Sequence, residues 1–234
     1  MFAIMRRELN SYFSSAIGYI FLAVFYLFAG YFFFFANVMS GTADMTNTFA
    51  SLFSIILFIV PILTMRLMSE DKKLKTDQLL LTAPVSIPGL VIGKLLAALV
   101  IYTIGVAITL VEAFVIGVFV SPDWAIIIAN FFGLLFMGAA ALALGMFISS
   151  LTENQVIAAI GGLAAMILIQ SVDMIASVIP VSFLSSFVAG CSFYTRYNDF
   201  TVGVLNFSNI VFFLSFAAVF VFLTVRVLEK RRWS

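Results

Sequence analysis

The chain has 234 residues, of which 64% are hydrophobic and only 10% are charged, and its formal net charge is +1. A soluble domain is about 25% charged, so this composition excludes a water-soluble fold and indicates an all-α integral membrane protein. The chain has no histidine and one cysteine, which excludes imidazole metal ligands and an internal disulfide.

The first 15 residues combine apolar and basic side chains in a helical pattern. One face of a helical wheel is apolar and the opposite face is polar. We expect residues 1–15 to form an interfacial helix along the inner leaflet of the membrane. A basic flank that only sets the membrane topology is the alternative. The apolar face consists of Phe2, Met5, Leu9, Tyr12 and Phe13, and the polar face of Arg6, Arg7, Glu8, Asn10, Ser11 and Ser14.

Six apolar stretches follow, each long enough for a helix of about 20 residues that crosses a bilayer. Their continuous runs lack the ten-residue alternation of a transmembrane β-barrel. We therefore predict a single transmembrane domain over 1–234, with its longest loops at 69–90 and 180–206. The predicted spans cover residues 16–38, 49–68, 91–120, 126–149, 155–179 and 207–227.

Basic residues set the predicted orientation of these spans. Eleven of the twelve Lys and Arg residues fall on one side, and only Arg196 falls on the other. Because basic loops stay in the cytoplasm, we predict a multi-pass protein of the inner (cytoplasmic) membrane with both termini in the cytoplasm. The predicted topology places these basic residues beside the inner leaflet of the lipid bilayer. Nothing in the sequence supports nucleic-acid binding.

The predicted cytoplasmic loop 69–90 is the longest polar interruption of the chain. Residues 69–77 carry charges of both signs, and residues 78–83 contain three consecutive leucines that are too short a run to cross a membrane. We expect Pro84 and Pro88 to stop any helix there. The pattern predicts a short amphipathic helix followed by a proline turn. An inert solvated hairpin is the alternative.

This loop resembles the segment between the second and third helices of ABC-2-type ABC transporter permeases. It is most similar to the branch that includes the gliding-motility and nitrous-oxide-reductase-maturation permeases, although Lys75 stands where Gly is usual and Gln78 where Glu is usual. The tail LTVRVLEKRRW also resembles the C-terminus of that branch, so the resemblance covers the whole chain. The matching loop residues are Glu70, Thr76, Leu79, Leu80, Leu81, Thr82, Pro84, Val85, Ser86, Gly93 and Lys94.

The resemblance implies a cytoplasmic coupling helix that docks on a separate ABC ATP-binding subunit. It also implies a second permease copy or a related permease, and export driven by ATP. The chain has no G-x-x-x-x-G-K-[ST] phosphate-binding motif, so we expect no cofactor and no enzymatic activity in it, with ATP and Mg²⁺ bound by the partner subunit. The residues expected to contact that subunit are Glu70, Lys72, Thr76, Leu79, Leu80, Leu81, Thr82, Pro84 and Val85.

Three polar residues inside the predicted spans are candidates for a translocation path. Glu112 lies in the third span, where a carboxyl group is expected to face protein or water. An interhelical hydrogen bond to a Ser, Thr or Gln is the alternative for Glu112. Gln170 and Asp173 lie nearly on one face of the fifth span, and Arg196 is a candidate partner for Asp173.

Small residues lie along the fourth and fifth spans, and a segment with several aromatic residues comes after the fifth span. Small side chains allow close approach of helix backbones, so we favour packing within the chain, with a dimer interface as the alternative. The aromatic segment 180–206 indicates a re-entrant or interfacial element, or an ordinary aromatic-belt loop. The small residues are Gly133, Gly138, Ala141, Gly145, Ala158, Gly161, Gly162 and Ala165.

Three functions are compatible with these features. The favoured function is the permease subunit of an ATP-driven exporter. The second is a membrane scaffold of an ABC-type motility or envelope complex without substrate flux, with an extracytoplasmic accessory protein as its partner. The third is an ion-coupled secondary transporter that uses Glu112 and Asp173. The sparse charge inside the spans and the elaborate loop favour the first.

Overall fold

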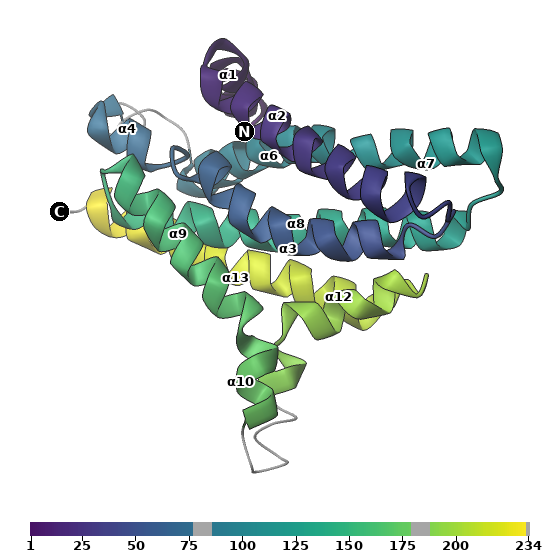
Figure 1. Cartoon of the computed structure of the whole chain (residues 1–234). Helices are drawn as coiled ribbons and strands as arrows, with labels where there is room; N and C mark the ends of the chain where they lie inside the picture. Colours follow the sequence, from purple (N-terminus) through teal and green to yellow (C-terminus); the bar gives the residue numbers. More distant parts are fainter. Residues whose placement is uncertain (77–85, 179–187, 233–234) are drawn as a thin grey trace.

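The helices of the chain form one bundle in the computed structural model, which describes residues 1–76, 86–178 and 188–232 (Figure 1). Within these ranges every regular element is a helix, which confirms the predicted all-α class. Five helical segments are long and apolar enough to cross a membrane. A sixth results if α9 (Gln155–Gln170) and α10 (Val172–Val178), which meet at an angle of 42°, are counted as one span. This is the pattern of a multi-pass membrane protein.

The helices begin and end close to the predicted positions. The helix predicted over residues 1–15 is confirmed as α1, the second predicted span corresponds to α3, and the short helix α4 lies at the start of the predicted loop 69–90. The third predicted span is a pair of helices, α6 and α7, that meet at Ala107. The remaining bounds are α1 (Phe2–Ser14), α2 (Ala16–Phe33), the π-helical η1 (Phe34–Val38), α3 (Thr46–Thr64), α4 (Ser69–Lys73), α6 (Ile87–Val106), α7 (Ile108–Phe119), α8 (Trp124–Leu151), α12 (Phe193–Thr201) and α13 (Phe207–Arg232).

The expectation that Pro84 and Pro88 stop a helix of residues 78–83 concerns residues outside the described ranges, but Pro88 itself lies within a helix. Ser86 has an extended backbone, the helix α6 begins at Ile87, and Pro88 occupies its first turn. The first turn of a helix tolerates proline, because the N–H groups there have no partner within the helix and the fixed φ angle of proline suits a helix. The third span therefore begins four residues before its predicted start, at residue 87 instead of 91.

Helix α8 lies at the centre of the bundle and packs against α3, α6, α9, α12 and α13. Three of its glycines touch large side chains of other helices. A Cβ added at Gly138 would lie 2.1 Å from the ring of Tyr102, and one at Gly145 would lie 2.3 Å from Thr64 Oγ1. At Gly133 the nearest ring atom, in Phe200, would be 2.8 Å away. For these three glycines, packing within the chain is confirmed.

The described part of segment 180–206 contains α12, which packs against α8 and α3. Phe193, Tyr197 and Phe200 on α12 are buried. Asn130 of α8 donates from Nδ2 to Phe200 O at 3.0 Å, and its Oδ1 accepts a 3.0 Å bond from the Tyr197 hydroxyl. These contacts make α12 part of the bundle core. Phe193, Tyr197 and Phe200 therefore serve packing inside the protein, whereas Tyr194 on the same helix is exposed.

The two ends of the bundle differ in charge. Helix α1, helix α4 and the C-terminal end of α13 lie at the same end, toward the left of Figure 1. We call this end, which holds Glu8, Arg66, Asp71, Lys94 and Arg231, the charged end. Between the ends, large apolar side chains such as Leu168 on α9 and Phe222 on α13 are exposed, as contact with lipid requires.

Candidate functional site at the charged end

Lys94 is a cation buried on α6. Its side chain is 2% exposed, and its Nζ donates to Leu67 O at 2.8 Å. The same Nζ lies 2.6 Å from Asp71 Oδ2 on α4 and 3.1 Å from Glu8 Oε1 on α1. Arg7 Nη2 shares this Glu8 oxygen at 2.6 Å. One ammonium group therefore joins three helices that are distant in the sequence.

Gly93, next to Lys94, gives α1 the room to approach α6. A Cβ added at Gly93 would lie 3.0 Å from Met1 O and 3.2 Å from the side chain of Ile4. Gly93 and Lys94 matched the permease pattern in the sequence, and each has a physical role in the structure. The glycine permits close contact with α1, and the lysine binds the carboxylate that α1 supplies.

Arg66 is a second buried cation, at the turn between α3 and α4. Its Nε donates to Glu70 Oε2 at 2.7 Å. Its two terminal nitrogens donate to Ser15 Oγ at 2.5 Å and to Ser11 Oγ at 2.8 Å. Each of the three Arg66 side-chain nitrogens therefore has a partner, and Arg66 binds the turn before α4 to the C-terminal end of α1.

Tyr12 adds an aromatic contact to this attachment of α1. The Arg66 guanidinium lies over the Tyr12 ring, with Cζ 5.2 Å from the ring centroid. Burial raises the pKa of the Tyr12 phenol, so its hydroxyl stays protonated and donates to Leu63 O at 2.9 Å. Cation–π contacts of this kind contribute about 0.5–2 kcal/mol. Tyr12 thus anchors α1 both to Arg66 and to the backbone of α3.

We call six charged side chains at this end the Lys94 network; four of them contact one another around Lys94, and Arg66 and Glu70 form a separate ion pair beside them. The six side chains comprise three cations and three carboxylates, so the network is neutral as a whole. Removing one partner of a buried ion pair costs about 3–5 kcal/mol, because the remaining charge stays buried. A movement of α4 must therefore move α1 and α6 as well, or break a buried ion pair at this energetic cost. The members are Arg7, Glu8, Arg66, Glu70, Asp71 and Lys94.

The inner end of α8 holds α4 from the other side. Ser149 Oγ accepts hydrogen bonds from the N–H groups of Met68 and Ser69 at 3.1 Å each, and donates to Met65 O at 3.0 Å. Lys72 is buried, and its Nζ donates to Ser150 O. The start of the predicted coupling loop is therefore attached to four helices, namely α1, α3, α6 and α8.

The chain after α4 makes a tight turn at the position where the family pattern has glycine. Lys75 has a φ angle of +56°, in the left-handed region that glycine adopts without strain. Thr76 Oγ1 donates to Asp71 Oδ1 at 2.9 Å and so closes this turn onto α4. The departure from the family pattern therefore retains the backbone shape that glycine would give.

Three of the residues predicted to contact an ATP-binding subunit lie in the described part of the chain. Glu70 pairs with Arg66, Lys72 binds α8, and Thr76 binds Asp71. All three contact other residues of the same chain. The other predicted contact residues lie outside the described residues; they are Leu79, Leu80, Leu81, Thr82, Pro84 and Val85.

The three residues predicted for a translocation path lie on separate elements. Glu112 on α7 is 7% exposed, and its Oε2 has no hydrogen-bond partner among the described residues. Gln170 ends α9, and Asp173 on α10 accepts bonds from Ser192 Oγ at 2.6 Å and Thr195 Oγ1 at 2.8 Å. Helix α7 packs against α2, α6 and α8, whereas α10 packs against α9 and α12. The structure does not bring these residues into one site.

Arg196 does not pair with Asp173, so that expectation is wrong. Its Nε donates to Gly190 O at 3.1 Å, and its Nη1 donates to Asn209 Oδ1 at 3.2 Å. Arg196 also lies over the Phe212 ring. Its partners belong to α13 and to the turn before α12. Arg196 therefore stabilises the packing of α12 on α13.

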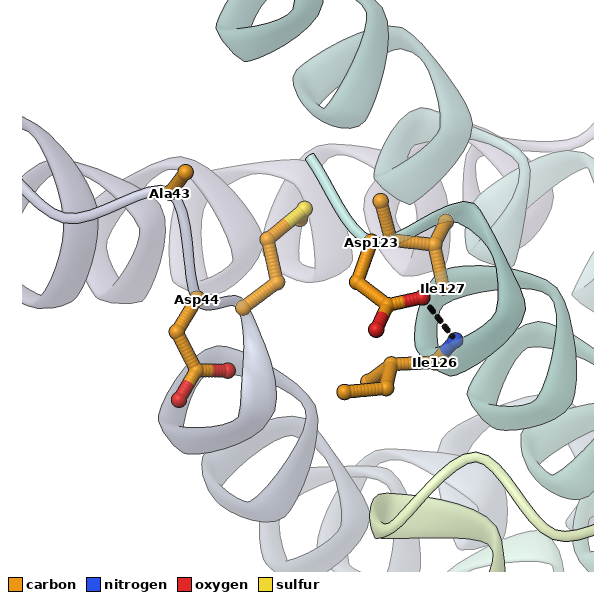
Figure 2. A pocket seen from close by; sticks show the side chains of 6 residues that line it. Ala43, Asp44, Asp123, Ile126 and Ile127 are labelled. Carbon is orange, nitrogen blue, oxygen red and sulfur yellow. Dashed lines mark hydrogen bonds between the residues drawn. The ribbon is translucent and has the colours of Figure 1, made fainter. Parts of the chain in front are cut away.

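A cavity of about 220 Å³ lies at the opposite end of the bundle, between the loop before α3 and the start of α8 (Figure 2). Its two carboxylates belong to Asp44 and Asp123. Asp44 Oδ1 accepts from Thr46 N at 2.9 Å, and Asp123 Oδ1 accepts from Ala125 N at 3.0 Å. Both aspartates therefore accept hydrogen bonds from N–H groups in the first turns of helices, and this role explains why carboxylates stand at these positions.

The comparisons assign the chain to no family: no family model matches the sequence, and no curated protein matches it. Its function therefore has to be inferred from its residues and geometry. The Lys94 network is the most elaborate polar contact within the described ranges, and sequence reasoning did not identify it as a site. The available signal was a lysine among apolar residues of a span, since a buried lysine requires a carboxylate.

Proposed function

We propose that the chain is the membrane-spanning permease subunit of an ATP-driven ABC transporter that works as an exporter. A separate ABC ATP-binding subunit would dock on the loop after α4, and a second permease copy or a related permease would complete the pathway. The observation that carries this proposal is the attachment of α4 to α1, α6 and α8 through the Lys94 network, Ser149 and Lys72.

The attachment supports coupling because a docked motor needs a stiff connection to the helices that it moves. A loop joined to its helices by flexible chain would move without moving them. Here a displacement of α4 acts on Lys94 through Asp71 at 2.6 Å, and on Arg66 through Glu70 at 2.7 Å. Closure of two ATP-binding subunits would thus move the charged ends of several helices together.

The experiment replaces Leu79, Leu80 and Leu81 by aspartate in the full chain. This variant is expressed together with an ATP-binding subunit encoded by a neighbouring gene. We expect loss of co-purification of that subunit, and ATPase activity that no longer responds to the permease. The control replaces Val204 and Leu205, which are also exposed apolar residues, by aspartate at the opposite end of the bundle. Unchanged co-purification and coupling in the triple variant would contradict the proposal.

Ion-coupled transport is the second candidate, because Glu112 Oε2 is buried without a partner in the described part of the chain. A carboxyl group of this kind binds a proton or a cation. Flux into vesicles that contain only the purified chain and an ion gradient, and its loss in Glu112→Gln, would favour this candidate. Flux that requires the ATP-binding subunit and ATP would favour the permease.

A further inference from the structure

The third span is interrupted at Ala107, which belongs to neither α6 nor α7. Its N–H group donates to Thr103 O at 2.9 Å, four residues back, as in a regular helix. Leu110 N–H donates to Ala107 O at 3.1 Å, which is only three residues back. A tightened turn of this kind inside a long helix often marks a hinge. The junction of α6 and α7 is therefore a place where the span can change its direction.

Two side-chain hydroxyl groups pair the backbone carbonyls at this junction. The Tyr26 hydroxyl of α2 donates to Ile104 O at 3.0 Å, and Thr109 Oγ1 donates to Val106 O at 2.8 Å. In a continuous helix each of these carbonyls would accept the N–H group four residues further along the chain. A carbonyl inside a membrane requires a protein donor, because water is absent there. The interrupted helix and a continuous helix both meet this requirement, through different donors.

A cavity beside α7 leaves space for a movement of this helix. Its volume is about 230 Å³, compared with about 30 Å³ for one water molecule. Protein interiors contain few voids larger than a water molecule, so α7 and η1 are not packed against each other at this point. One wall of the cavity consists of Val115, Ile116 and Phe119 on α7, and the other of Phe33, Val38 and Thr42.

Only one face of α7 is buried in the bundle. Glu112 and Ala113 are buried, whereas Phe114 and Val118 are exposed. The segment Ile87–Phe119 has 33 residues. At 1.5 Å per residue it is about 50 Å long, which exceeds the hydrocarbon core of about 30 Å. An interruption allows the part of this long span beyond the junction to take its own direction in the membrane.

We propose that Ala107 is the pivot of a hinge, about which α7 swings toward η1 and closes the cavity between them. In the closed form the helix is continuous, and Ile104 O and Val106 O exchange their hydroxyl donors for helical N–H groups. The Tyr26 hydroxyl holds the open form, because it occupies Ile104 O. Such an exchange of partners gives two discrete states. This inference does not depend on the proposed function, because every contact involved lies within one chain.

The test measures closure as the rate of disulfide formation between Val38→Cys and Phe119→Cys, which lie on opposite walls of the cavity. The full chain carries Cys191→Ser and is reconstituted in phospholipid vesicles, with copper phenanthroline as the oxidant. A hydrogen bond between membrane helices corresponds to about threefold in an equilibrium, so Tyr26→Phe should raise the rate about threefold. Val115→Trp should lower the rate, because the larger side chain occupies the cavity.

Two controls and a second variant separate movement of the hinge from general loosening of the structure. Tyr19→Phe removes an exposed hydroxyl group of α2 that makes no hydrogen bond within the described ranges, and it should leave the rate unchanged. The cysteine pair Ala43→Cys with Ile126→Cys spans the cavity of Figure 2 and should react equally fast with and without Tyr26→Phe. Thr109→Val removes the other hydroxyl donor and should also raise the rate across the cavity beside α7.

Three results would overturn the hinge. The first is an equal rate in the Tyr26→Phe and Tyr19→Phe variants, which would mean that the Tyr26 hydroxyl does not hold α7. The second is a rise for both cysteine pairs in the Tyr26→Phe and Thr109→Val variants, which would mean that the hydroxyl groups stabilise the whole fold and not one position of α7. The third is disulfide formation in detergent but not in vesicles, which would mean that lipid chains fill the cavity in the membrane.

Discussion

Lys94 shows how one side chain can set the geometry of the charged end. Its ammonium group is almost completely buried and contacts Glu8, Asp71 and the carbonyl of Leu67. A lysine at this position costs desolvation energy, which only nearby carboxylates offset. Asp71 Oδ2 has no hydrogen-bond partner among the described residues besides this ion pair. The two groups are therefore mutually dependent.

Replacing Lys94 by methionine should destabilise the protein by about 3–5 kcal/mol, because Glu8 and Asp71 would keep only the half-exposed Arg7 as a nearby cation. The measurement is the unfolding midpoint of the purified protein in detergent. Adding Glu8→Gln and Asp71→Asn to this variant should restore much of the loss. Lys73→Met, an exposed lysine on the same short helix, serves as the control and should change little. Equal midpoints for the two single variants would contradict the role of Lys94.

Three residues at the charged end were predicted from the sequence to have a different role. Glu70, Lys72 and Thr76 were expected to face a partner subunit, and they are engaged with their own chain. Sequence spacing could not pair Glu8 with Lys94, because 86 positions and two spans separate them. Only the packing of α1 against α6 brings them together. The contact therefore depends on tertiary structure that no local pattern encodes.

At the scale of helices, the packing of α8 depends on glycines that leave space for side chains of the neighbouring helices. Gly138→Ala would place a Cβ 2.1 Å from the Tyr102 ring, whose hydroxyl is fixed by a 2.8 Å bond to Leu134 O. The ring cannot shift without losing that bond, so we expect destabilisation of about 1–3 kcal/mol. Thermal unfolding in detergent measures the effect.

Gly30→Ala on α2 is the matched control. No atom lies within 4 Å of the position that its Cβ would take. Alanine is a better helix former than glycine by about 0.5–1 kcal/mol, so this variant should be at least as stable as the wild type. A similar loss in both variants would mean that glycine serves helix flexibility in general and not the contact with Tyr102.

Hydropathy located the helices well because each span must be apolar along its whole length. It could not show that α9 and α10 meet at 42°, since no proline or glycine marks the bend at Ser171. It also could not distinguish α12 from a loop, because this helix is short and carries polar residues such as Asn198 and Asp199. The burial of Phe193 and Tyr197 arises only when α12 packs on the bundle.

At the scale of the whole molecule, both termini lie toward the same end (Figure 1). This arrangement agrees with an even number of spans, and the basic residues gather at that end. Hydropathy predicted the all-α class and six spans, and the structure has five candidate spans, or six if α9 and α10 count as one. Hydropathy and charge could not predict that α8 is central, because all the spans are similarly apolar and the choice is made by the fit of glycines and rings.

The orientation can be tested by labelling with a membrane-impermeant maleimide in intact cells, after Cys191 has been replaced by serine. We expect Val204→Cys, an exposed position beside the start of α13, to be labelled from outside. A cysteine added after Ser234 should be labelled only once the cells are permeabilised, if the basic end lies in the cytoplasm as the charge distribution predicts. The reverse pattern would mean that the predicted topology is inverted.

The Lys94 network also has a consequence for biogenesis. Glu8 and Asp71 precede Lys94 in the sequence, so both carboxylates are synthesised before the cation that joins them. The third apolar segment supplies their cation, and only then can the N-terminal helix bind α6 in addition to Leu63 and Arg66. A nascent chain that ends before residue 94 would therefore lack the contact between α1 and Lys94 while it retains the residues that bind Tyr12 and Ser11.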